Sequence, residues 1–129
     1  MRQTTVETVV AQARAAQTQF ETASQEVVDE LIIGLAWAII EPETNRSLAE
    51  QAVLETGLGN VEDKIIKNHR KTLGLLRDLK KATSCGIIRE IPEQGLVEIA
   101  RPVGVVGAVT PSTNPIATPL NKTLNALKG

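Results

Sequence analysis

The sequence has 129 residues, of which 42 % are apolar, and this composition favours a single globular domain over a disordered chain. Phe20 and Trp37 are the only aromatic residues, so stacking on nucleic-acid bases is not an expected function. The one cysteine, Cys85, excludes an internal disulfide. Neither it nor the single His69 has a second Cys or His at a metal-ligand spacing. A cytoplasmic protein without a metal site is therefore expected.

Charge and hydropathy give two further expectations. No signal peptide is predicted, because the first residues mix polar and apolar types. The longest apolar run, 31–40, is about half of the ~20 residues that span a bilayer, so we expect a buried helix there.

The net charge is −1, but residues 1–60 carry nine acidic and three basic side chains, whereas 61–129 carry six acidic and eleven basic ones. The two halves therefore have opposite charge.

Two helices are predicted in the first 40 residues. Thr4 and Glu7 form a capping box for the first helix, and Thr22 with Gln25 repeats this signature for the second. The second helix ends before Pro42. It has apolar residues outside its main stripe and must be covered on more than one side. The first helix carries one apolar stripe at helical spacing: Val6, Val9, Val10, Ala13, Ala16 and Phe20.

Two more helices are predicted before any strand. Asn45 or Ser47 caps the third helix, and Gly57 stands where a left-handed residue ends it. Asn60 opens the fourth helix, which runs to about Lys81. Its apolar residues are expected to face inward: Ile65, Ile66, Leu73, Leu76 and Leu79. Its basic residues are expected to face mostly outward: Lys64, Lys67, Arg70, Lys71, Arg77, Lys80 and Lys81.

After residue 86 the pattern changes to strands. Segments 87–91 and 96–99 flank a turn and mix apolar with charged residues, which predicts a partly solvated hairpin. Segment 103–109 is apolar throughout, as a parallel strand covered on both faces requires. A last helix is predicted from Asn114, as its N-cap, to Lys128. Pro119 should kink this helix or delay its regular part. The predicted strand 103–109, the turn after it and the last helix form the first part of a right-handed βαβ unit, but its second strand is missing. An incomplete α/β protein is therefore expected.

Three segments carry a resemblance to a known family. Residues 100–115, ARPVGVVGAVTPSTNP, resemble the first dinucleotide-fold strand and turn of the aldehyde dehydrogenase superfamily. The form Thr-Pro-Ser-Thr-Asn-Pro is similar to the acylating branch, which converts an aldehyde, NAD and coenzyme A to an acyl-CoA and NADH. Segments 55–69 and 83–86 resemble the same branch, including the dehydrogenase half of bifunctional aldehyde-alcohol dehydrogenases. The resemblance covers roughly residues 20–129 in unbroken order.

The resemblance implies an α/β fold. Residues 1–85 would be helices packed on the start of a Rossmann-like dinucleotide-binding domain, and 86–101 a β-hairpin arm that joins subunits into a homo-oligomer. Residues 102–129 would be the first strand, turn and helix of the NAD-binding domain. The chain would then be an N-terminal fragment, with the nucleophilic Cys, the ribose-binding Lys and Glu, and the glycine-containing pyrophosphate loop beyond residue 129. No catalytic nucleophile or base is therefore expected in this chain.

The turn after the predicted strand is the expected ligand side, because ligands bind beyond the carboxyl ends of strands in open α/β sheets. By resemblance, Thr110, Pro111, Ser112 and Thr113 would face the aldehyde and the nicotinamide side of NAD, with NADP as the alternative. The hydrolytic branch has Pro-Trp-Asn-Phe-Pro here, and its Asn supports the oxyanion. A gapless match places Thr113 under that Asn and Asn114 one position later. Either residue supports the oxyanion, or backbone amides do so alone; we predict Thr113 for the oxyanion and Asn114 for the helix cap.

Three other features have two interpretations each. Cys85 is interpreted as structural rather than nucleophilic, because no local His activates it. His69, on the inner edge of the fourth helix, is interpreted as a structural helix residue rather than a base. The basic face of the 61–81 helix is interpreted as solvated, with binding of coenzyme A phosphates as the alternative. Near-neutral charge and the lack of interleaved aromatic residues argue against nucleic acid.

The expected partners are a small aldehyde, coenzyme A and other copies of the chain, without nucleic acid or membrane. The rival hypothesis is a non-catalytic helical module for assembly or targeting, since some relatives carry amphipathic N-terminal peptides that direct them into bacterial microcompartments. The predicted helix 4–20 is amphipathic, but it also fits the family's own first helix. We therefore favour the enzyme interpretation and a cytoplasmic location, with the microcompartment as the alternative. The identity of the aldehyde is left open.

Overall fold

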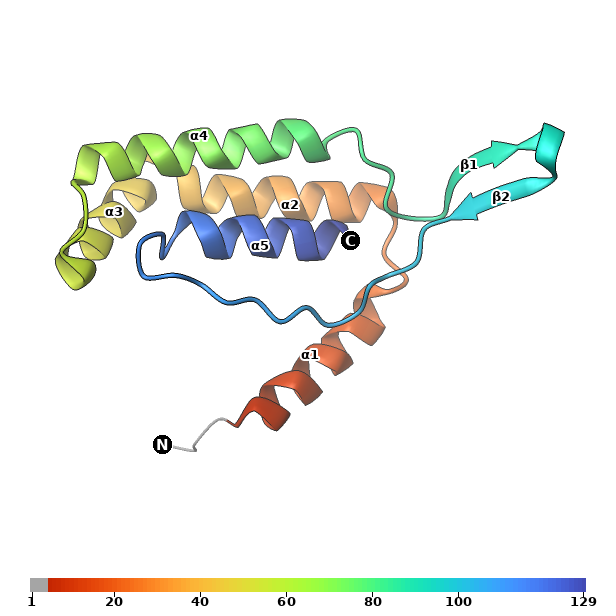
Figure 1. Ribbon diagram of the computed structural model, residues 1–129, viewed down its shortest axis with the longest axis horizontal. Coiled ribbons are helices and arrows are strands. Elements are labelled where there is room, and N and C mark those ends of the chain that lie inside the picture. Colours follow the sequence, from red (N-terminus) through yellow and green to blue (C-terminus); the bar gives the residue numbers. More distant parts are fainter. Residues whose placement is uncertain (1–4) are drawn as a thin grey trace.

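The structure, a computed structural model, describes residues 5–129. Helices α2, α4 and α5 lie side by side, α3 packs across one end of α2 and α4, and α1 and a β-hairpin project away from this bundle (Figure 1). No described helix is both long and apolar enough to cross a membrane. The elements in chain order are α1 (Val6–Phe20), α2 (Gln25–Ile40), α3 (Pro42–Thr56), α4 (Val61–Leu79), β1 (Ile87–Ile91), the 3-10 helix η1 (Pro92–Gln94), β2 (Leu96–Ile99) and α5 (Ala117–Lys128).

The core is aliphatic and lies between α2, α4 and α5. Ile32 and Ala36 of α2 and Leu120 and Leu124 of α5 are buried at its centre. Partly buried side chains surround them: Leu35, Ile39, Leu75, Leu76, Leu79 and Leu127. Because aromatic residues are nearly absent, the three helices are held together by branched aliphatic side chains.

Only one face of α2 is covered in the described residues. The prediction that this helix is covered on more than one side is wrong for residues 5–129. Leu31, Ile33 and Trp37 are 42–61 % exposed, because no other described element packs on that side. Such an apolar surface is typical of a segment that binds another part of a protein or a partner.

The side of α4 that meets α3 is polar, whereas Leu75, Leu76 and Leu79 in the second half of the helix pack on the apolar core. Asn68 is 2 % exposed and its Nδ2 donates to Oδ1 of Asn45 in α3, at 2.9 Å. Asn45 in turn donates from Nδ2 to the carbonyl of Ile65, at 3.1 Å. These bonds satisfy polar groups that are costly to bury alone, so they fix which face of α4 meets α3.

The predicted orientation of α4 is right in part, because Leu76 and Leu79 pack on the core and most basic residues of the helix are exposed. Lys64, expected outside, is buried, whereas Ile66 and Leu73, expected inside, are 54 % and 43 % exposed. His69 is also exposed rather than on the inner edge. The hydrogen bonds of Asn45 and Asn68 satisfy the polar groups between α3 and α4, so this side of α4 is buried without an apolar stripe.

Serine and threonine cap the first two helices, one or two positions from the predicted residues. Oγ1 of Thr5 accepts from the N–H of Thr8, at 3.3 Å, and begins α1. The predicted cap Thr4 lies outside the described residues. In α2, Oγ of Ser24 accepts from Val27, at 3.3 Å. The predicted cap Thr22 is wrong, because its hydroxyl instead donates back to the end of α1.

Helix α3 begins earlier than predicted. Oε2 of Glu41 accepts from the N–H of Thr44, at 2.9 Å, and Pro42 occupies the first helical position. The predicted caps Asn45 and Ser47 therefore lie inside the helix. Proline suits the first turn because it needs no N–H there, and the hydrogen bond from Thr44 holds the pKa of Glu41 below its usual value.

The break between α3 and α4 is as predicted. Gly57 ends α3 with φ of 65°, a left-handed conformation that favours glycine. Asn60 caps α4 by accepting from the N–H of Asp63, at 2.9 Å. Here the local residue preferences decide the structure, because both ends are exposed.

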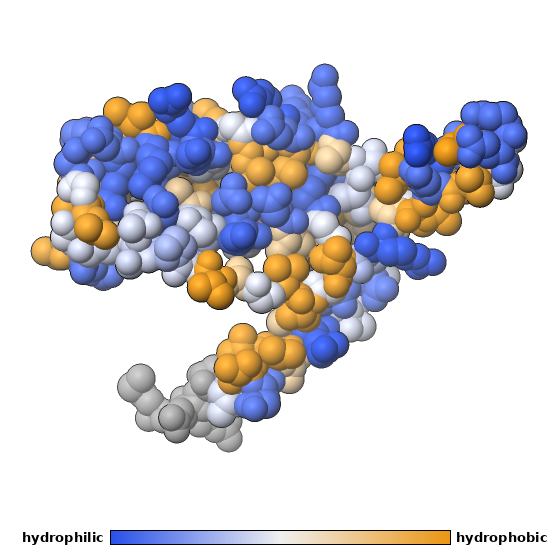
Figure 2. Space-filling model, viewed as in Figure 1, coloured by the Kyte–Doolittle hydropathy of each residue, from blue (hydrophilic) through white to orange (hydrophobic). Residues whose placement is uncertain are grey.

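The hairpin is confirmed and stands apart from the bundle. β1 pairs antiparallel with β2, with Ile91 opposite Leu96 and an irregularity between Ile87 and Arg89. Arg89 donates two hydrogen bonds to Glu98, at 2.7 and 2.8 Å, and this contact lowers the pKa of the Glu98 carboxyl. Figure 2 shows apolar surface along the projecting hairpin. The arm therefore carries exposed apolar side chains on a stable turn.

Segment 103–109 is not a strand. The prediction is wrong for residues 5–129, because their only sheet consists of β1 and β2, and 103–109 pairs with neither. Its one anchor is a hydrogen bond from the N–H of Val103 to the carbonyl of Gly129, at 3.1 Å. Val109 is 89 % exposed. The N–H and C=O groups of a strand need a neighbouring strand as hydrogen-bond partner. Because residues 5–129 provide none for this segment, they do not form the Rossmann-like sheet.

Candidate functional site: the turn before helix α5

The predicted ligand turn folds back on itself before α5 begins. The N–H of Asn114 donates to the carbonyl of Pro111, at 3.2 Å, and the carbonyl of Asn114 accepts from Thr118, at 3.4 Å. The regular helix starts at Ala117, and its N-terminal flanking residue is Ile116, without a side-chain cap. Pro119 lies in the first turn, which agrees with a delayed helix start. The predicted capping role of Asn114 is wrong.

The side chain of Asn114 contacts α4 instead. Nζ of Lys67 donates to Oδ1 of Asn114, at 2.5 Å, and both side chains are half-buried. The carbonyl end of the amide is therefore occupied. Nδ2 of Asn114 has no hydrogen-bond partner within residues 5–129. Lys67 thus orients the amide so that its donor end is available to a ligand.

The other predicted site residues are divided between two hollows. Thr113 lines a small cleft of about 150 Å³ together with Asp63, Lys64 and Lys67. Thr110 lines a wide groove of about 830 Å³ between α1, segment 104–110 and α5. Pro111 and Ser112 are exposed at the tip of the turn: with Thr110 and Thr113, all four expected cofactor-binding residues face solvent. The structure therefore brings Thr113 and Asn114 together at Lys67, and places Thr110 further away.

A second cleft opens beside Asn114, between α4 and α5. Its volume is about 170 Å³ and it is lined by Lys67, Lys71, Asn114, Ala117, Thr118 and Asn121, which we call the α4–α5 cleft. The lysines belong to the basic face predicted from the sequence, whereas Thr118 and Asn121 were not among the predicted site residues. Their spacing is the signal that could have found them, because positions three, four and seven residues apart share one face of a helix.

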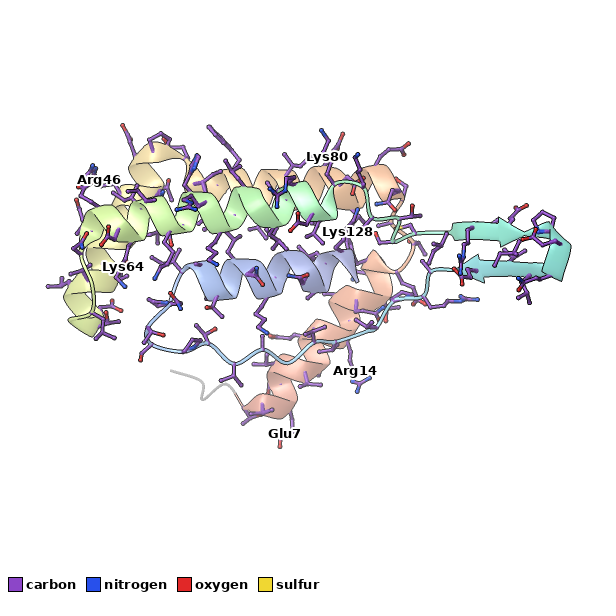
Figure 3. All side chains as sticks on the ribbon, turned by 45° about the horizontal axis from the view of Figure 1, so that its top comes forward. Glu7, Arg14, Arg46, Lys64, Lys80 and Lys128 are labelled. Atoms are coloured by element: carbon purple, nitrogen blue, oxygen red, sulfur yellow. The ribbon has the colours of Figure 1, made fainter. Side chains whose placement is uncertain are left out.

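The α4–α5 cleft is electropositive. Among the described residues, no carboxylate lines it. The nearest acidic side chain along α4, Asp63, is bound by Nδ2 of Asn60 at 2.7 Å. Lys67 is paired with a neutral amide rather than with an acid. Figure 3 shows the position of Lys64 at the start of α4, the next basic side chain toward α3. These charges favour an anionic ligand.

Cys85 lies in a different environment, at the far end of the bundle. Its N–H and that of Ser84 donate to Oε1 of Gln25, at 3.2 and 2.8 Å. His69 lies ten positions before the end of α4, about 15 Å along the helix axis. No His therefore activates the thiol within residues 5–129, which supports the structural interpretation of Cys85.

A partly buried ion pair lies beside this cysteine. Nζ of Lys128 donates to Oδ1 of Asp29, and Nε2 of Gln25 donates to the same oxygen, at 3.0 Å. The hydrogen bond from Lys128 holds the pKa of Asp29 below its usual value. The Lys128 side chain is 4 % exposed, and Figure 3 shows it at the C-terminal end of α5. This cluster joins α2, α5 and the chain after α4, and its role is structural.

Comparison with known proteins places the chain in a wider context. No protein-family model matches it. A sulfoacetaldehyde dehydrogenase (acylating) of Cupriavidus necator is 62 % identical over 123 residues, covering 95 % of this chain and 25 % of that protein. An aldehyde-alcohol dehydrogenase of Clostridium acetobutylicum is 44 % identical, covering 89 % of this chain and 13 % of that protein. An acetylating aldehyde dehydrogenase structure from Geobacillus thermoglucosidasius matches with a TM-score of 0.90 and 40 % identity, covering 95 % of this chain and 27 % of that one.

The comparisons confirm the resemblance carried by residues 100–115 and extend it beyond residues 20–129. The chain spans about a quarter of the length of the C. necator protein and of the G. thermoglucosidasius structure. Identity of 40 % together with a TM-score of 0.90 shows that the helices and the hairpin have the same arrangement in the two chains. Along nearly its whole length, the chain is a homologue of the acylating aldehyde dehydrogenases.

Proposed function

We propose that the chain is a segment of an NAD-dependent acylating aldehyde dehydrogenase, which converts an aldehyde, NAD and coenzyme A to an acyl-CoA and NADH. The 62 % identity with the C. necator enzyme over 123 residues carries this proposal. The segment contributes binding and orientation. The nucleophile comes from elsewhere in the enzyme, because Cys85 has no activating partner within residues 5–129.

The substrate that the structure favours is an anionic aldehyde, and sulfoacetaldehyde is the specific proposal. The name of the C. necator relative points to this compound. The basic character of the α4–α5 cleft supports the same choice, since a sulfonate is negative at neutral pH.

Asn114 is the residue proposed to support the oxyanion formed when a thiolate attacks the aldehyde. Its Oδ1 is held by Lys67, so Nδ2 is presented as a donor. A preoriented donor stabilises developing charge without reorganisation during the reaction. Thr113 stays the alternative, because its hydroxyl is exposed in the neighbouring cleft on the other side of Lys67.

The turn is proposed to receive the nicotinamide part of NAD. Bound NAD would accept the hydride, and the residues of this turn would position its nicotinamide ring. The hydroxyls of Thr110, Ser112 and Thr113 have no partner within residues 5–129 and are exposed, so they fit a polar ring substituent. NADP is the alternative, because both cofactors carry the same nicotinamide ring.

The hairpin 86–101 is proposed to be the assembly arm of a cytoplasmic homo-oligomer. Its strands leave Ile87, Leu96 and Val97 about half exposed, and both outer edges lack a partner strand in residues 5–129. Pairing of such an edge with another subunit would satisfy these backbone groups and bury the side chains.

One observation favours a second candidate, a helical targeting or assembly module. Helix α1 buries no residue in the described chain, and Val6 of its apolar stripe is 77 % exposed. The wide groove between α1, segment 104–110 and α5 offers a simpler explanation. Strands of the same enzyme would fill this groove and cover both surfaces, so we prefer the enzyme function.

A chimera tests the proposed function. The matching quarter of the C. necator enzyme is replaced by residues 1–129, which gives a complete enzyme with this segment. NADH formation should then require both sulfoacetaldehyde and coenzyme A. A folded, soluble chimera that binds NAD but forms no NADH, beside an active parent enzyme, would refute the proposal.

A further inference from the structure

The α4–α5 cleft has a donor set that matches one chemical group. Thr118 and Asn121 lie one turn apart on α5 and face Lys67 and Lys71 of α4 across the cleft. Oδ1 of Asn121 accepts from Nδ2 of Asn125, at 3.2 Å. The amide nitrogen of Asn121, the hydroxyl of Thr118 and the ammonium of Lys71 have no hydrogen-bond partner in the described part of the chain. The cleft therefore presents several free donors and no acid.

Such a set suits an anion with several terminal oxygens. A lysine ammonium carries three donors and a full charge, and hydrogen bonds from charged donors are the stronger ones. The start of α5 lies at the same place, where the free N–H groups and the helix dipole add positive potential. Charge, donors and helix end all point to the same kind of ligand.

The α4–α5 cleft lies next to the proposed position of the aldehyde group. Asn114 lines the cleft and is also the proposed oxyanion donor. Lys71 lies one turn beyond Lys67 on α4, about 6 Å along the axis. In sulfoacetaldehyde the sulfur is two bonds from the carbonyl carbon. An aldehyde whose oxygen meets Asn114 can therefore place its sulfonate within the same small cleft, which Lys71 also lines.

From this arrangement we infer that the α4–α5 cleft is the sulfonate-recognition site of the enzyme, with Lys71 as its principal charge and Thr118 and Asn121 as its neutral donors. The inference rests on the proposed function and assigns substrate specificity to this segment. Lys67 has a separate task, since it orients Asn114. Lys71 is therefore the residue whose change affects substrate choice without moving the oxyanion donor.

Kinetics of the chimera test the assignment. Lys71→Met should raise the KM for sulfoacetaldehyde about tenfold or more, because a charged hydrogen-bond partner is lost, with little change in kcat. The KM for propionaldehyde, which is neutral, should stay the same or fall, and Lys71→Arg should restore most of the sulfoacetaldehyde affinity. Lys80→Met is the matched control, because Lys80 is exposed just after the end of α4 and does not line the α4–α5 cleft.

The same kinetics separate failure of this inference from failure of the proposed function. An active chimera in which Lys71→Met affects both aldehydes equally would overturn the sulfonate site and leave the enzyme function standing. A rise in the KM for coenzyme A with propionaldehyde as substrate would assign the lysine to a coenzyme A phosphate instead. It would overturn the inference as well.

A binding measurement on the chimera decides the case independently of turnover. Ethanesulfonate carries the sulfonate but no carbonyl. At constant ionic strength it should shift the amide resonances of Lys71, Thr118 and Asn121, and should not do so in Lys71→Met. Equal shifts in both chimeras, or none in the unsubstituted chimera, would overturn the inference even if the chimera were inactive.

Discussion

Lys67 and Asn114 lie 47 positions apart in the sequence, and Nζ of Lys67 donates to Oδ1 of Asn114 at 2.5 Å. This bond connects the middle of α4 to the turn before α5. It also removes Asn114 from the helix-capping role, because its amide oxygen accepts from Lys67 and α5 begins three residues later, at Ala117, without a side-chain cap. Lys67 is a positioning residue for the proposed oxyanion donor.

The first prediction concerns Asn114 in the chimera. Asn114→Ala should lower kcat by about 10² to 10³, the usual effect of removing an oxyanion donor, with little change in melting temperature. Lys67→Met should lower kcat less, because the amide is present but less well oriented. Steady-state kinetics with a thermal melt of each variant make the comparison.

Thr113→Ala tests the alternative oxyanion donor. Its effect on kcat should be small if Asn114 is the donor. A large loss for Thr113→Ala, with Asn114→Ala reducing only the melting temperature, would restore the assignment that the sequence alone suggested.

The second prediction concerns the buried amide pair. Asn68→Ala removes the donor to Oδ1 of Asn45 and leaves that oxygen buried without its partner, so stability should fall by about 1–3 kcal/mol. His69→Ala, one position further on an exposed face, should change stability by less than about 0.5 kcal/mol. Urea unfolding followed by circular dichroism measures both. Equal losses would mean that α4 does not have the orientation described.

The third prediction concerns acid stability. The pKa of Asp29 is lowered in the folded chain by the hydrogen bond from Lys128, so the unfolded chain binds the proton more readily. The contribution of Asp29 is therefore complete above its unfolded pKa and is lost as the pH falls through its folded value. Thermal melts at decreasing pH should show this loss in the unsubstituted chain.

Asp29→Asn should remove that acid-dependent part of the melting curve and lower stability at neutral pH, since buried Lys128 loses its carboxylate. Glu30→Gln, an exposed neighbour in α2, is the control and should keep the acid dependence. A pH profile of Asp29→Asn that matches the unsubstituted chain would show that the ion pair does not form in solution.

The fourth prediction concerns assembly of the 129-residue chain. The hairpin edges and segment 103–109 leave backbone and apolar groups unpaired within the described residues, so the chain should self-associate on size exclusion at micromolar concentration. Val97→Lys, on exposed β2, should reduce this association. A monodisperse monomer with a cooperative melt would show that the domain boundary is misjudged.

The sequence was sufficient where exposed local preferences decide the structure. Gly57 and Asn60 marked the break between α3 and α4, and the turn at Pro92 marked the hairpin, because each depends only on neighbouring residues. The family was also identifiable, since the segment from residue 100 to 115 is long and distinctive.

The remaining features depend on contacts between distant residues. The orientation of α4 follows from Asn45 and Asn68, which are 23 positions apart, and a helical pattern of apolar residues does not reveal such a pair. The contact of Lys67 with Asn114 is equally non-local. Segment 103–109 has strand-like composition, but a strand also requires a neighbour, which residues 5–129 do not provide.

The most direct test of the central claim is NADH formation by the chimera that carries residues 1–129 in place of the matching quarter of the C. necator enzyme. With NAD, sulfoacetaldehyde and coenzyme A, its absorbance should rise at a rate within about tenfold of the parent enzyme, and omission of coenzyme A should abolish the rise. Cys85→Ser should leave the rate unchanged. A folded chimera that is inactive with coenzyme A, or whose activity disappears in Cys85→Ser, would contradict the account.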